Sequence, residues 1–479
     1  MHRNAKAFAI AELRRRKLRW LKRITSGLLI ILIVAVCAWA CWPNAAQQRL
    51  KEALAELDRS DPGWRLEDIE AAREPIPEGE NSARVVMAAF NLLPRQWPPR
   101  ELEALLGALS PEVRLAPEEF QRLKQELDNV QPALKEARKL ADMPRGRHHL
   151  EYQPFVMYTA LYDQANIYRV VHLLYYDSLQ HDQEQDILSA LNACRATLHA
   201  AASIGDEPFA ASQRIRIAGV ILTCQGIERA LAQGDPPPRE IANLQNLLRK
   251  EDDFPDRIVI ARGERASLHE SFTAIERGDV PLTHHFFGRR PAWEEYVYGW
   301  FTRDKFREAH PAMLAEMTRF VNIAQLPSPQ QTPAERAREA RLRALKEFDP
   351  LDVLDTPALQ KVFDASRRKH VYLRSTIAAL AAEGYRQKHK KWPDSLDMLC
   401  PQFLASVPRD PFDGELLRYR RVEDGVVMYS VGSDRADNNG NLDPEHPDAP
   451  GVDVGVRLWD VDKRRQPPRR IPDHEPQPR

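Results

Sequence analysis

The stretch from Ile24 to Trp42 carries no charge and is almost entirely apolar. As a helix that rises about 1.5 Å per residue, it is long enough to cross a hydrocarbon core of about 30 Å. Seven Lys and Arg residues crowd positions 14–23, just before it, and such basic flanks stay in the cytoplasm. We therefore predict a cytoplasmic leader over residues 1–23, a transmembrane anchor over residues 24–43, and a long remainder outside the cytoplasm.

Two other interpretations of the apolar stretch stay open. A cleaved signal peptide has a similar basic start, and Ala38-Trp39-Ala40 is a weak cleavage motif. The long leader and the long apolar run favour a retained anchor over that peptide. A lipoprotein would need a lipobox before Cys37 or Cys41, and the residues that precede them do not form one.

Between residues 44 and 354 apolar positions recur at helical spacing, and strand patterns are nearly absent. Asn81 is placed to cap a helix that ends before Pro94, and Pro117 opens one expected to reach about Ala141. Further helices are expected over residues 208–233, 239–250, 256–277, 291–325 and 333–347. The pattern predicts an antiparallel helical array, without the strict period near 34 residues that marks tetratricopeptide repeats.

Two helices of this array carry charges among apolar residues. The charged positions are Arg214, Arg216 and Glu228 on one helix and Arg262, Glu264 and Arg265 on the other. Such charges usually form a solvated or salt-bridged helix face, and we expect that here. The segments around them, 205–231 and 261–266, resemble a helical region of uncharacterised, membrane-anchored bacterial proteins of the planctomycete type. The resemblance implies a bacterial inner membrane with the bulk of the chain in the periplasm, and it implies no activity.

Residues 355–460 have a different pattern, which predicts a small α+β domain. A long helix is expected over residues 357–390, followed by the Trp392-Pro393 turn and a turn at residues 408–411. Leu417 and Tyr419 then alternate in one strand and are expected to face Val427, Tyr429 and Val431 in a second, across a hairpin. Val454, Val456 and Leu458 form a third alternating run. The fold class is thus mainly α, with a three-stranded antiparallel sheet in this domain and a disordered tail over residues 461–479.

The order of motifs in this domain resembles the major pseudopilin of type II secretion systems. The matching positions are Tyr385, Arg386, Trp392, Pro393, Leu396, Pro408, Asp410, Pro411, Tyr419, Tyr429, Ser430, Gly432 and Asp434. The resemblance implies a calcium loop after the second strand. Pseudopilins begin with a cleavage site and a Glu-bearing apolar helix next to this domain. Here the anchor has neither feature and lies some 300 residues away, so the resemblance does not extend to assembly into a pseudopilus.

The acidic loop between the second and third strands is the candidate site. It places oxygen-bearing side chains close together in the sequence, as Ca²⁺ requires. The candidate ligands are Asp434, Asp437, Asn439, Asn441, Asp443 and Asp453. The spacing is not that of an EF-hand, and a turn-rich surface loop has a similar composition. Calcium binding and a solvated turn are the two interpretations.

Composition excludes one class of partner. Lys and Arg total 69 and Asp and Glu total 69, and the single basic cluster belongs to the membrane leader. This balance argues against nucleic acid. The cysteines show no metal-binding spacing, and we expect Cys194, Cys224 and Cys400 to be buried, with a Cys194–Cys224 bridge as the alternative.

Signatures of catalysis are scarce. His148-His149 and His284-His285 are adjacent pairs that cannot direct both rings at one metal from a helix. No HExxH, GxSxG, phosphate-binding loop or GxGxxG is present. We therefore expect a non-enzymatic structural or interaction role, with the membrane and other envelope proteins as partners. The alternative is an anchored hydrolase-type enzyme, and a deep pocket with converging carboxylates or histidines in the array would favour it.

Overall fold

The computed structural model describes residues 45–468, apart from 108, 154, 157, 158, 162, 281–291, 328, 329, 332 and 339–355, and the single positions 20 and 31. The predicted anchor, residues 24–43, lies outside the described residues except at Ile31. Among the helices that are described, none is both long enough and apolar enough to span a bilayer.

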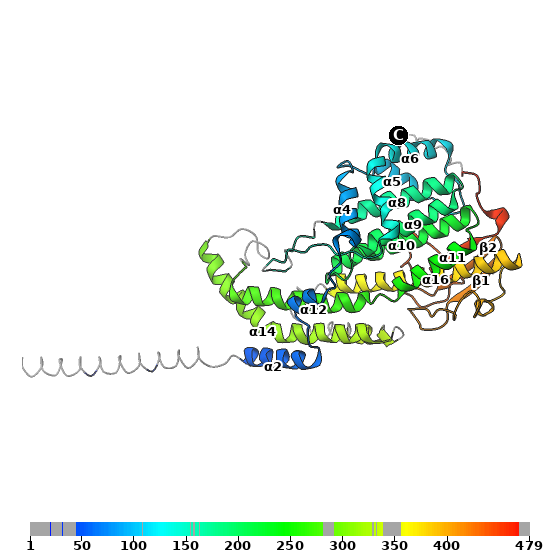
Figure 1. Cartoon of the computed structure of the whole chain (residues 1–479). Helices are drawn as coiled ribbons and strands as arrows, with labels where there is room; N and C mark the ends of the chain where they lie inside the picture. Colours follow the sequence, from blue (N-terminus) through cyan, green and yellow to red (C-terminus); the bar gives the residue numbers. More distant parts are fainter. Residues whose placement is uncertain are drawn as a thin grey trace, which may run out of the picture.

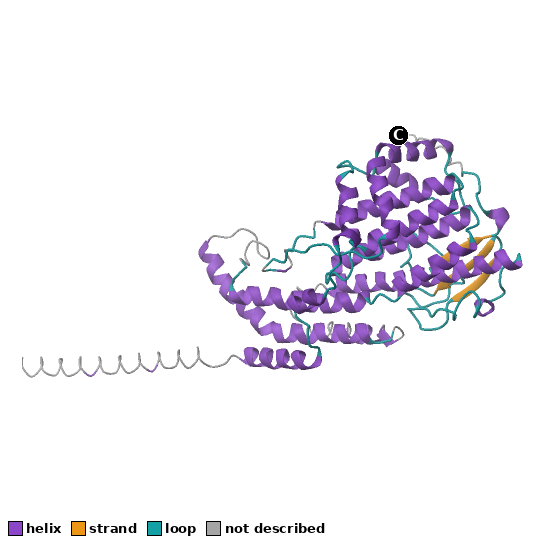
Figure 2. Ribbon diagram, viewed as in Figure 1, coloured by secondary structure: helices purple, strands orange, loops and turns teal. Residues whose placement is uncertain are grey.

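Helices dominate the described chain, and the strands are confined to its C-terminal part (Figures 1 and 2). The helices are α2 (Ala45–Ser60), α3 (Leu66–Ala72), α4 (Ser82–Asn91), α5 (Arg100–Gly107), α6 (Pro117–Asn129), α7 (Gln131–Ala137), α8 (Asp163–Gln183), α9 (Ile187–Ala202), α10 (Ala210–Gln233), α11 (Pro238–Asp252), α12 (Asp256–Arg277), α14 (Ala292–Gln325) and α16 (Thr356–His389). Short 3₁₀ turns cover Glu78–Glu80, Arg138–Asp142, Leu396–Leu399 and Val461–Lys463. The strands are β1 (Arg418–Val422), β2 (Gly425–Ser430) and β3 (Val454–Trp459). The prediction of a mainly helical fold with a small antiparallel sheet is confirmed.

The helical array is built on α8, α9 and α10, which lie side by side in the body of the molecule (Figure 1). Glycines let these helices approach closely. A Cβ added at Gly219 of α10 would lie 2.5 Å from the Cβ of Ala201 on α9, and one at Gly226 would lie 2.9 Å from the Sγ of Cys194. Because packed cores tolerate little added volume, these glycines fix the spacing of α9 and α10.

Local signals set the ends of several helices as predicted. The Oδ1 of Asn81 accepts a hydrogen bond from the N–H of Ala83 and so caps α4. The helix predicted from Pro117 to about Ala141 is instead interrupted at Val130, whose φ of −118° and ψ of 22° are not helical. Pro132 explains the break, because it has no N–H to donate within a continuous helix and its ring would clash with the carbonyl four residues before it. Part of the predicted helix over residues 333–347 lies outside the described residues.

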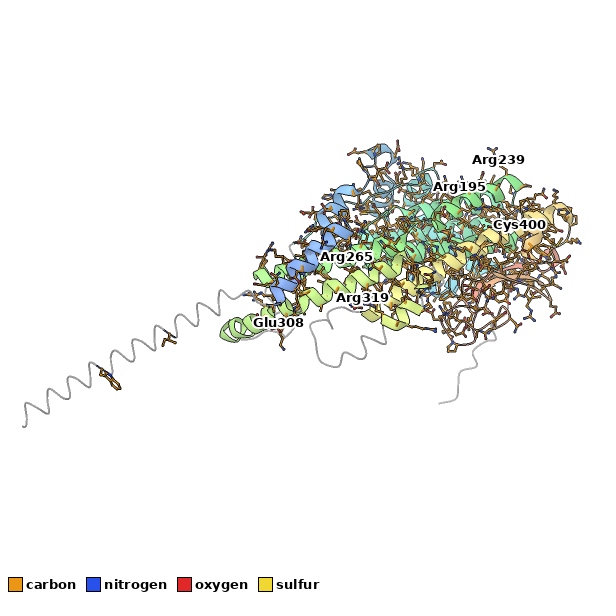
Figure 3. The ribbon with its side chains drawn as sticks, turned by 90° about the horizontal axis from the view of Figure 1, so that it is seen from below. Arg195, Arg239, Arg265, Glu308, Arg319 and Cys400 are labelled. Carbon is orange, nitrogen blue, oxygen red and sulfur yellow. The ribbon has the colours of Figure 1, made fainter. Side chains whose placement is uncertain are left out.

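An arm formed by α2, α12 and α14 extends from the body (Figure 1). Leu50, Leu54 and Leu57 of α2 join an apolar core with residues such as Met313 and Met317 of α14. In Figure 3, Arg265 lies on this arm, while Cys400 lies toward the opposite end of the molecule. The apolar stripe of α2 therefore attaches the first described helix firmly to the arm.

The sheet has the order β1-β2-β3 and is antiparallel throughout. Its residues Val426, Met428 and Val456 belong to a core that also contains residues of α9, α10, α11 and α16. The prediction that Tyr419 faces Val427 and Tyr429 is wrong by one residue. Tyr419 pairs with Met428, and Tyr429 pairs with Arg418. Every residue of β2 is buried, so its hydrophobic pattern does not indicate which face meets the helices.

Two motifs that carry the pseudopilin resemblance have structural roles here. The hydroxyl of Tyr419 donates to the carbonyl of Pro393 at 2.7 Å and ties the Trp392-Pro393 turn to β1. The carboxylate of Asp410 accepts from the hydroxyl of Ser430 at 2.7 Å and from the N–H of Val431 at 3.0 Å. Asp410 thus fastens the turn at residues 408–411 to the end of β2.

The first part of the predicted tail is built into the fold. Arg464 is buried and forms an ion pair with Glu383 of α16 at 2.9 Å. The N–H of Gln466 donates to the carbonyl of Glu112 at 2.7 Å. Residues 461–468 therefore bind to the array and are not a free tail, because Arg464 pairs with buried Glu383 and Arg465 donates to the carbonyls of Asp182 and Gln183. Residues 469–479 lie outside the described part.

Candidate functional site

The predicted calcium loop folds so that two of its carboxylates, those of Asp434 and Asp453, share a neighbour in Asn438. Asp453 accepts from the N–H groups of Asn438 at 3.3 Å and Gly440 at 2.7 Å. Asp434 accepts from the side-chain amide of the same Asn438 at 3.4 Å. Asp437 accepts from the hydroxyl of Tyr429 at 3.1 Å. The pKa of Asp453 is raised, mainly by burial and also by the charge of Asp437. Asn438 thus joins Asp434 to Asp453, and Asp437 lies near enough to Asp453 for its charge to affect the pKa of that group.

The other three predicted ligands have separate partners. The side-chain amide of Asn441 donates to the carbonyl of Gly451 at 2.7 Å. Asn439 has a φ of 60°, and its carbonyl accepts from Arg420 at 2.7 Å. Asp443 accepts from the N–H groups of Glu445 and His446 and lies on its own exposed turn.

The carboxylates of this loop are engaged with the loop itself. The N–H groups of Ala436 and Gly451 hold the pKa of Asp434 below its usual range. Among the described residues, no group of three or more His, Cys, Asp and Glu side chains is arranged to hold a metal ion. Asn side chains and backbone carbonyls also bind Ca²⁺, so calcium binding by this loop stays a prediction.

A cavity of about 330 Å³ lies beside residues 148–153 and the start of α8. His148, Asp163 and Glu207 are among the residues that line it. The Nδ1 of His148 lies 3.0 Å from the Oδ2 of Asp163, and its Nε2 lies 3.2 Å from the Oγ of Ser203. The cavity therefore has the converging histidine and carboxylates that the enzyme alternative requires.

Asn81 and Ser82 at the start of α4 hold His148 in place. Both the N–H and the hydroxyl of Ser82 donate to the carbonyl of Arg145, at 2.9 Å and 2.8 Å. The side chain of Asn81 bonds to both the N–H and the carbonyl of Arg147. The segment before His148 is thus fixed to the array through its backbone.

Ser203, His148 and Asp163 have the connectivity of a hydrolase triad, but not its accessibility. Ser203 is fully buried, and its hydroxyl donates to the carbonyl of Ala200 at 2.6 Å in the last turn of α9. The imidazole and the carboxylate line the cavity, whereas Ser203 does not. A substrate in the cavity would meet the ring and not the hydroxyl, so this arrangement holds His148 in place instead of presenting a nucleophile.

The two carboxyl groups of the cavity have different environments. The hydrogen bond with His148 holds the pKa of Asp163 below its usual value. Burial raises the pKa of Glu207, and the charge of Asp163 adds to the rise, although Ser212 and His148 oppose it. Carboxyl groups with separated pKa values are typical of acid–base sites, and they also occur in structural networks.

Little in the sequence indicated this cavity. His148 was visible only as one of an adjacent pair, and Asp163 and Ser203 lie 15 and 55 residues away from it. Residues so far apart in a helical array meet only through tertiary packing, which a single sequence does not reveal.

A second cavity, of about 550 Å³, lies between α11, α16 and the turn at residues 408–411. We call it the arginine cleft because Arg249 of α11, Arg374 of α16 and Arg409 of the turn line it. Arg374 binds Asp252 at 3.0 Å and donates to the carbonyl of Arg409 at 2.8 Å. Asp252 and Asp410 also line the cleft. Asp252 is already paired with Arg374, and the side chain of Asp410 is buried against β2, so Arg249 and Arg409 leave the accessible wall with a net positive charge.

Of the charges noted on α10 and α12, Arg214 is exposed, as expected for a solvated face. The other five are salt-bridged or hydrogen-bonded, and several of them are buried. Arg216 and Arg265 are 6% and 1% exposed and bind Glu251 and Asp61. Their partners come from other helices or loops, because these faces point into the array.

Of the cysteines, Cys194 and Cys224 are buried and free, and Cys400 is free and partly buried. Burial raises the pKa of the Cys224 thiol to about 12. The prediction of buried cysteines is confirmed for the first two.

Neither a protein-family model, nor a curated protein, nor a solved structure matches this chain. The resemblances to pseudopilins and to planctomycete-type membrane-anchored proteins therefore stay predictions.

Proposed function

We propose that this chain is a membrane-anchored envelope protein with a non-enzymatic, structural or interaction role, linked to assemblies of the type II secretion kind. Its anchor holds it in the bacterial inner membrane, with the N-terminus in the cytoplasm and the bulk in the periplasm. The arginine cleft carries this proposal. Guanidinium groups from three separate elements border one accessible cavity, and arginine binds carboxylates strongly and with defined geometry.

The position of the arm supports the same role. The predicted anchor ends at residue 43, and α2 begins at Ala45 and packs on α14. A flexible linker has no room between them, so the folded part would stand directly on the membrane surface. A body held in this way is suited to positioning a binding surface at a fixed height above the bilayer.

Cross-linking in membranes tests the proposal. A photoreactive residue replaces Ser406, which is exposed at the cleft, in the full-length protein. We expect discrete cross-linked products with envelope proteins, and we expect their loss in the double variant Arg249→Glu/Arg409→Glu. Arg239→Glu, an exposed change on the same helix α11, is the matched control and should retain them. Products that survive the double charge reversal would refute binding at the cleft.

An anchored hydrolase-type enzyme is the second candidate, and the cavity at His148 is the observation that favours it. In that case Asp163 would act as the base and Glu207 as the acid, since their pKa values are lowered and raised, respectively. Chemical labelling of Ser203 would distinguish a serine hydrolase from an enzyme that uses Asp163 and Glu207 as base and acid.

A further inference from the structure

The outer edge of β1 is open over part of its length. A two-residue turn joins β1 to β2, so the last residue of β1 forms a hydrogen-bonded pair with the first residue of β2. Because such pairs alternate along antiparallel strands, the backbone groups of residues 417, 419 and 421 point away from β2. The N–H of Leu417 donates in that direction to the carbonyl of Pro408 at 2.9 Å. Among the described residues, the N–H and carbonyl groups of Tyr419 and Arg421 have no partner there.

The opposite edge of the sheet is covered. The N–H of Arg457 in β3 points away from β2 and donates to the carboxylate of Glu228 on α10 at 2.8 Å. An edge strand with unpaired N–H and carbonyl groups is a template for a further strand, and proteins normally cover or block such edges. Many peptide-binding proteins instead use an open edge to bind an extended segment of a partner. The edge of β1 at Tyr419 and Arg421 can accept a strand in this way.

A groove of about 630 Å³ lies beside this open edge. Tyr419 and Arg421 line it on the side of the sheet, and the end of α16 with the turn after it, residues 390–394, lines it on the other side. The hydroxyl of Tyr419 donates to the carbonyl of Pro393 at 2.7 Å and links the two sides. Side chains of a strand point alternately to its two faces, so every second side chain of an added strand would enter this groove. The groove therefore provides a means of selecting the strand that binds.

The groups of the groove that lack an ion pair are mainly cationic. Arg421 and Asp460 bind each other at 2.8 Å. Within the part of the chain that the structure describes, Lys390 and Lys391 are exposed without an ion pair, as is the carboxylate of Asp394. The other charged groups that line the groove are paired with residues outside it: Arg386 and Asp462. The unpaired groups thus carry a net positive charge, which favours an acidic partner.

We propose that the open edge of β1 binds an acidic, extended segment of another protein, which joins the sheet as a fourth strand. Its backbone bonds to Tyr419 and Arg421, and its carboxylates pair with Lys390 and Lys391. A second copy of β1 is disfavoured as the occupant, because an antiparallel pair of β1 strands places arginines of the two copies opposite each other. This surface goes beyond the proposed binding at the arginine cleft and does not depend on it.

Fluorescence anisotropy on the full-length protein in detergent tests the proposal. The probe is a fluorescein-labelled, amidated heptapeptide in which valine and glutamate alternate, so that the carboxylates share one face of a strand. We expect saturable binding. N-methylation of alternate residues along one edge of the peptide should weaken binding about tenfold, because the hydrogen bonds to β1 are lost. N-methylation along the other edge, which is the matched control, should change binding little.

Two replacements of Arg421 separate its backbone from its side chain. Arg421→Pro removes the outward N–H and keeps the pairing with β2, because edge strands accept proline where the N–H faces solvent. Arg421→Ala removes the same side chain but retains the N–H. We expect the proline variant to bind the peptide about tenfold more weakly than the alanine variant. Lys391→Glu should also weaken binding, whereas Lys361→Glu, an exposed change near the other end of α16, should not.

The outcomes that overturn the proposal are distinct. Absence of binding overturns it, as does equal weakening by both patterns of N-methylation, since charge alone would then hold the peptide. Loss of binding in Arg249→Glu/Arg409→Glu would place the peptide in the arginine cleft instead. A dimer in sedimentation that Arg421→Pro dissociates and Arg421→Ala does not would assign the edge to a second copy. The N-methylated peptides need only the wild type, so the test does not require the proline variant to fold.

Discussion

Lys369 of α16 is fully buried, and its Nζ lies 3.0 Å from the Oδ2 of Asp256 at the start of α12. Glu251 of α11 lies 3.7 Å from the same ammonium group. Burial alone raises the pKa of Asp256, but Lys369 and His370 together hold it below its usual range. Lys369 therefore joins three helices at the point where the arm meets the body.

Removal of this ammonium group should destabilise the protein strongly. In Lys369→Met the carboxylates of Asp256 and Glu251 stay buried without their shared cation. Breaking a buried ion pair from one side typically costs about 3–5 kcal/mol. Urea unfolding of the full-length protein in detergent, followed by circular dichroism, measures the change.

The matched control is Lys361→Met, an exposed position on the same helix, which should change stability by less than about 0.5 kcal/mol. Equal midpoints for the two variants would mean that Lys369 has no net role in joining the helices. The double variant Lys369→Met/Asp256→Asn should recover part of the loss, because it removes one of the unpaired charges.

Glu228 of α10 makes stability depend on pH. It accepts from the N–H of Arg457 in β3 at 2.8 Å, and burial raises its pKa to about 8. The folded protein therefore keeps this proton to a higher pH than the unfolded chain, whose carboxyl has the ordinary value of 4.5. This contribution is complete below the unfolded pKa and is lost as pH rises toward 8.

We therefore expect the urea midpoint of the wild type to fall between pH 5 and pH 8. Glu228→Gln keeps an acceptor for Arg457 but cannot ionise, so its midpoint should fall less over that range. Asp182, whose pKa burial also raises to about 8, contributes with the same sign, so some slope should remain. An identical slope in Glu228→Gln would contradict this assignment.

Much of the fold could be predicted because it rests on local signals. The limits of α12, the cap at Asn81 and the three short strands follow from periodicity, capping and turn residues. The pairing of β1 with β2 could not be predicted to the residue, because β2 is buried on both faces and its pattern fits either one. The ordered start of the tail was not predicted, because its arginines are held by residues distant in the sequence, such as Glu383 and Asp182.

The candidate sites were less accessible to prediction for a physical reason. The residues of the acidic loop are contiguous in the sequence, so its composition alone indicated a candidate metal site. The cavity at His148 joins residues from three separated segments. Such sites depend on tertiary placement, which periodicity does not encode.

Ser203 should not react as a catalytic serine. A fluorophosphonate probe labels activated, accessible serines, and Ser203 is fully buried with its proton donated to Ala200. We expect no labelling of the folded full-length protein, measured by intact mass and peptide mapping. Labelling that is specific to Ser203 and lost in His148→Ala would instead establish the hydrolase, and it would refute the non-enzymatic proposal.

Calcium should stabilise the folded protein through the acidic loop. A ligand that binds only the folded state stabilises it by about 2.7 kcal/mol at a hundredfold excess over Kd. We expect millimolar Ca²⁺ to raise the melting midpoint of the full-length protein by a few degrees relative to chelator. Mg²⁺ should do much less, because it demands near-ideal octahedral geometry and loses water reluctantly.

Variants of the loop test which carboxylates hold the ion. Asp434 and Asp453 share Asn438, and the charge of Asp437 acts on Asp453, whereas Asp443 lies on its own turn with His446. Asp437→Asn should therefore abolish the response to calcium, and Asp443→Asn, the matched control, should keep most of it. Both replacements preserve size, so the midpoint in chelator should change little. If the wild-type melting midpoint is the same with Ca²⁺ as with chelator, the loop is a hydrogen-bonded turn whose carboxylates accept from the N–H groups of the loop itself.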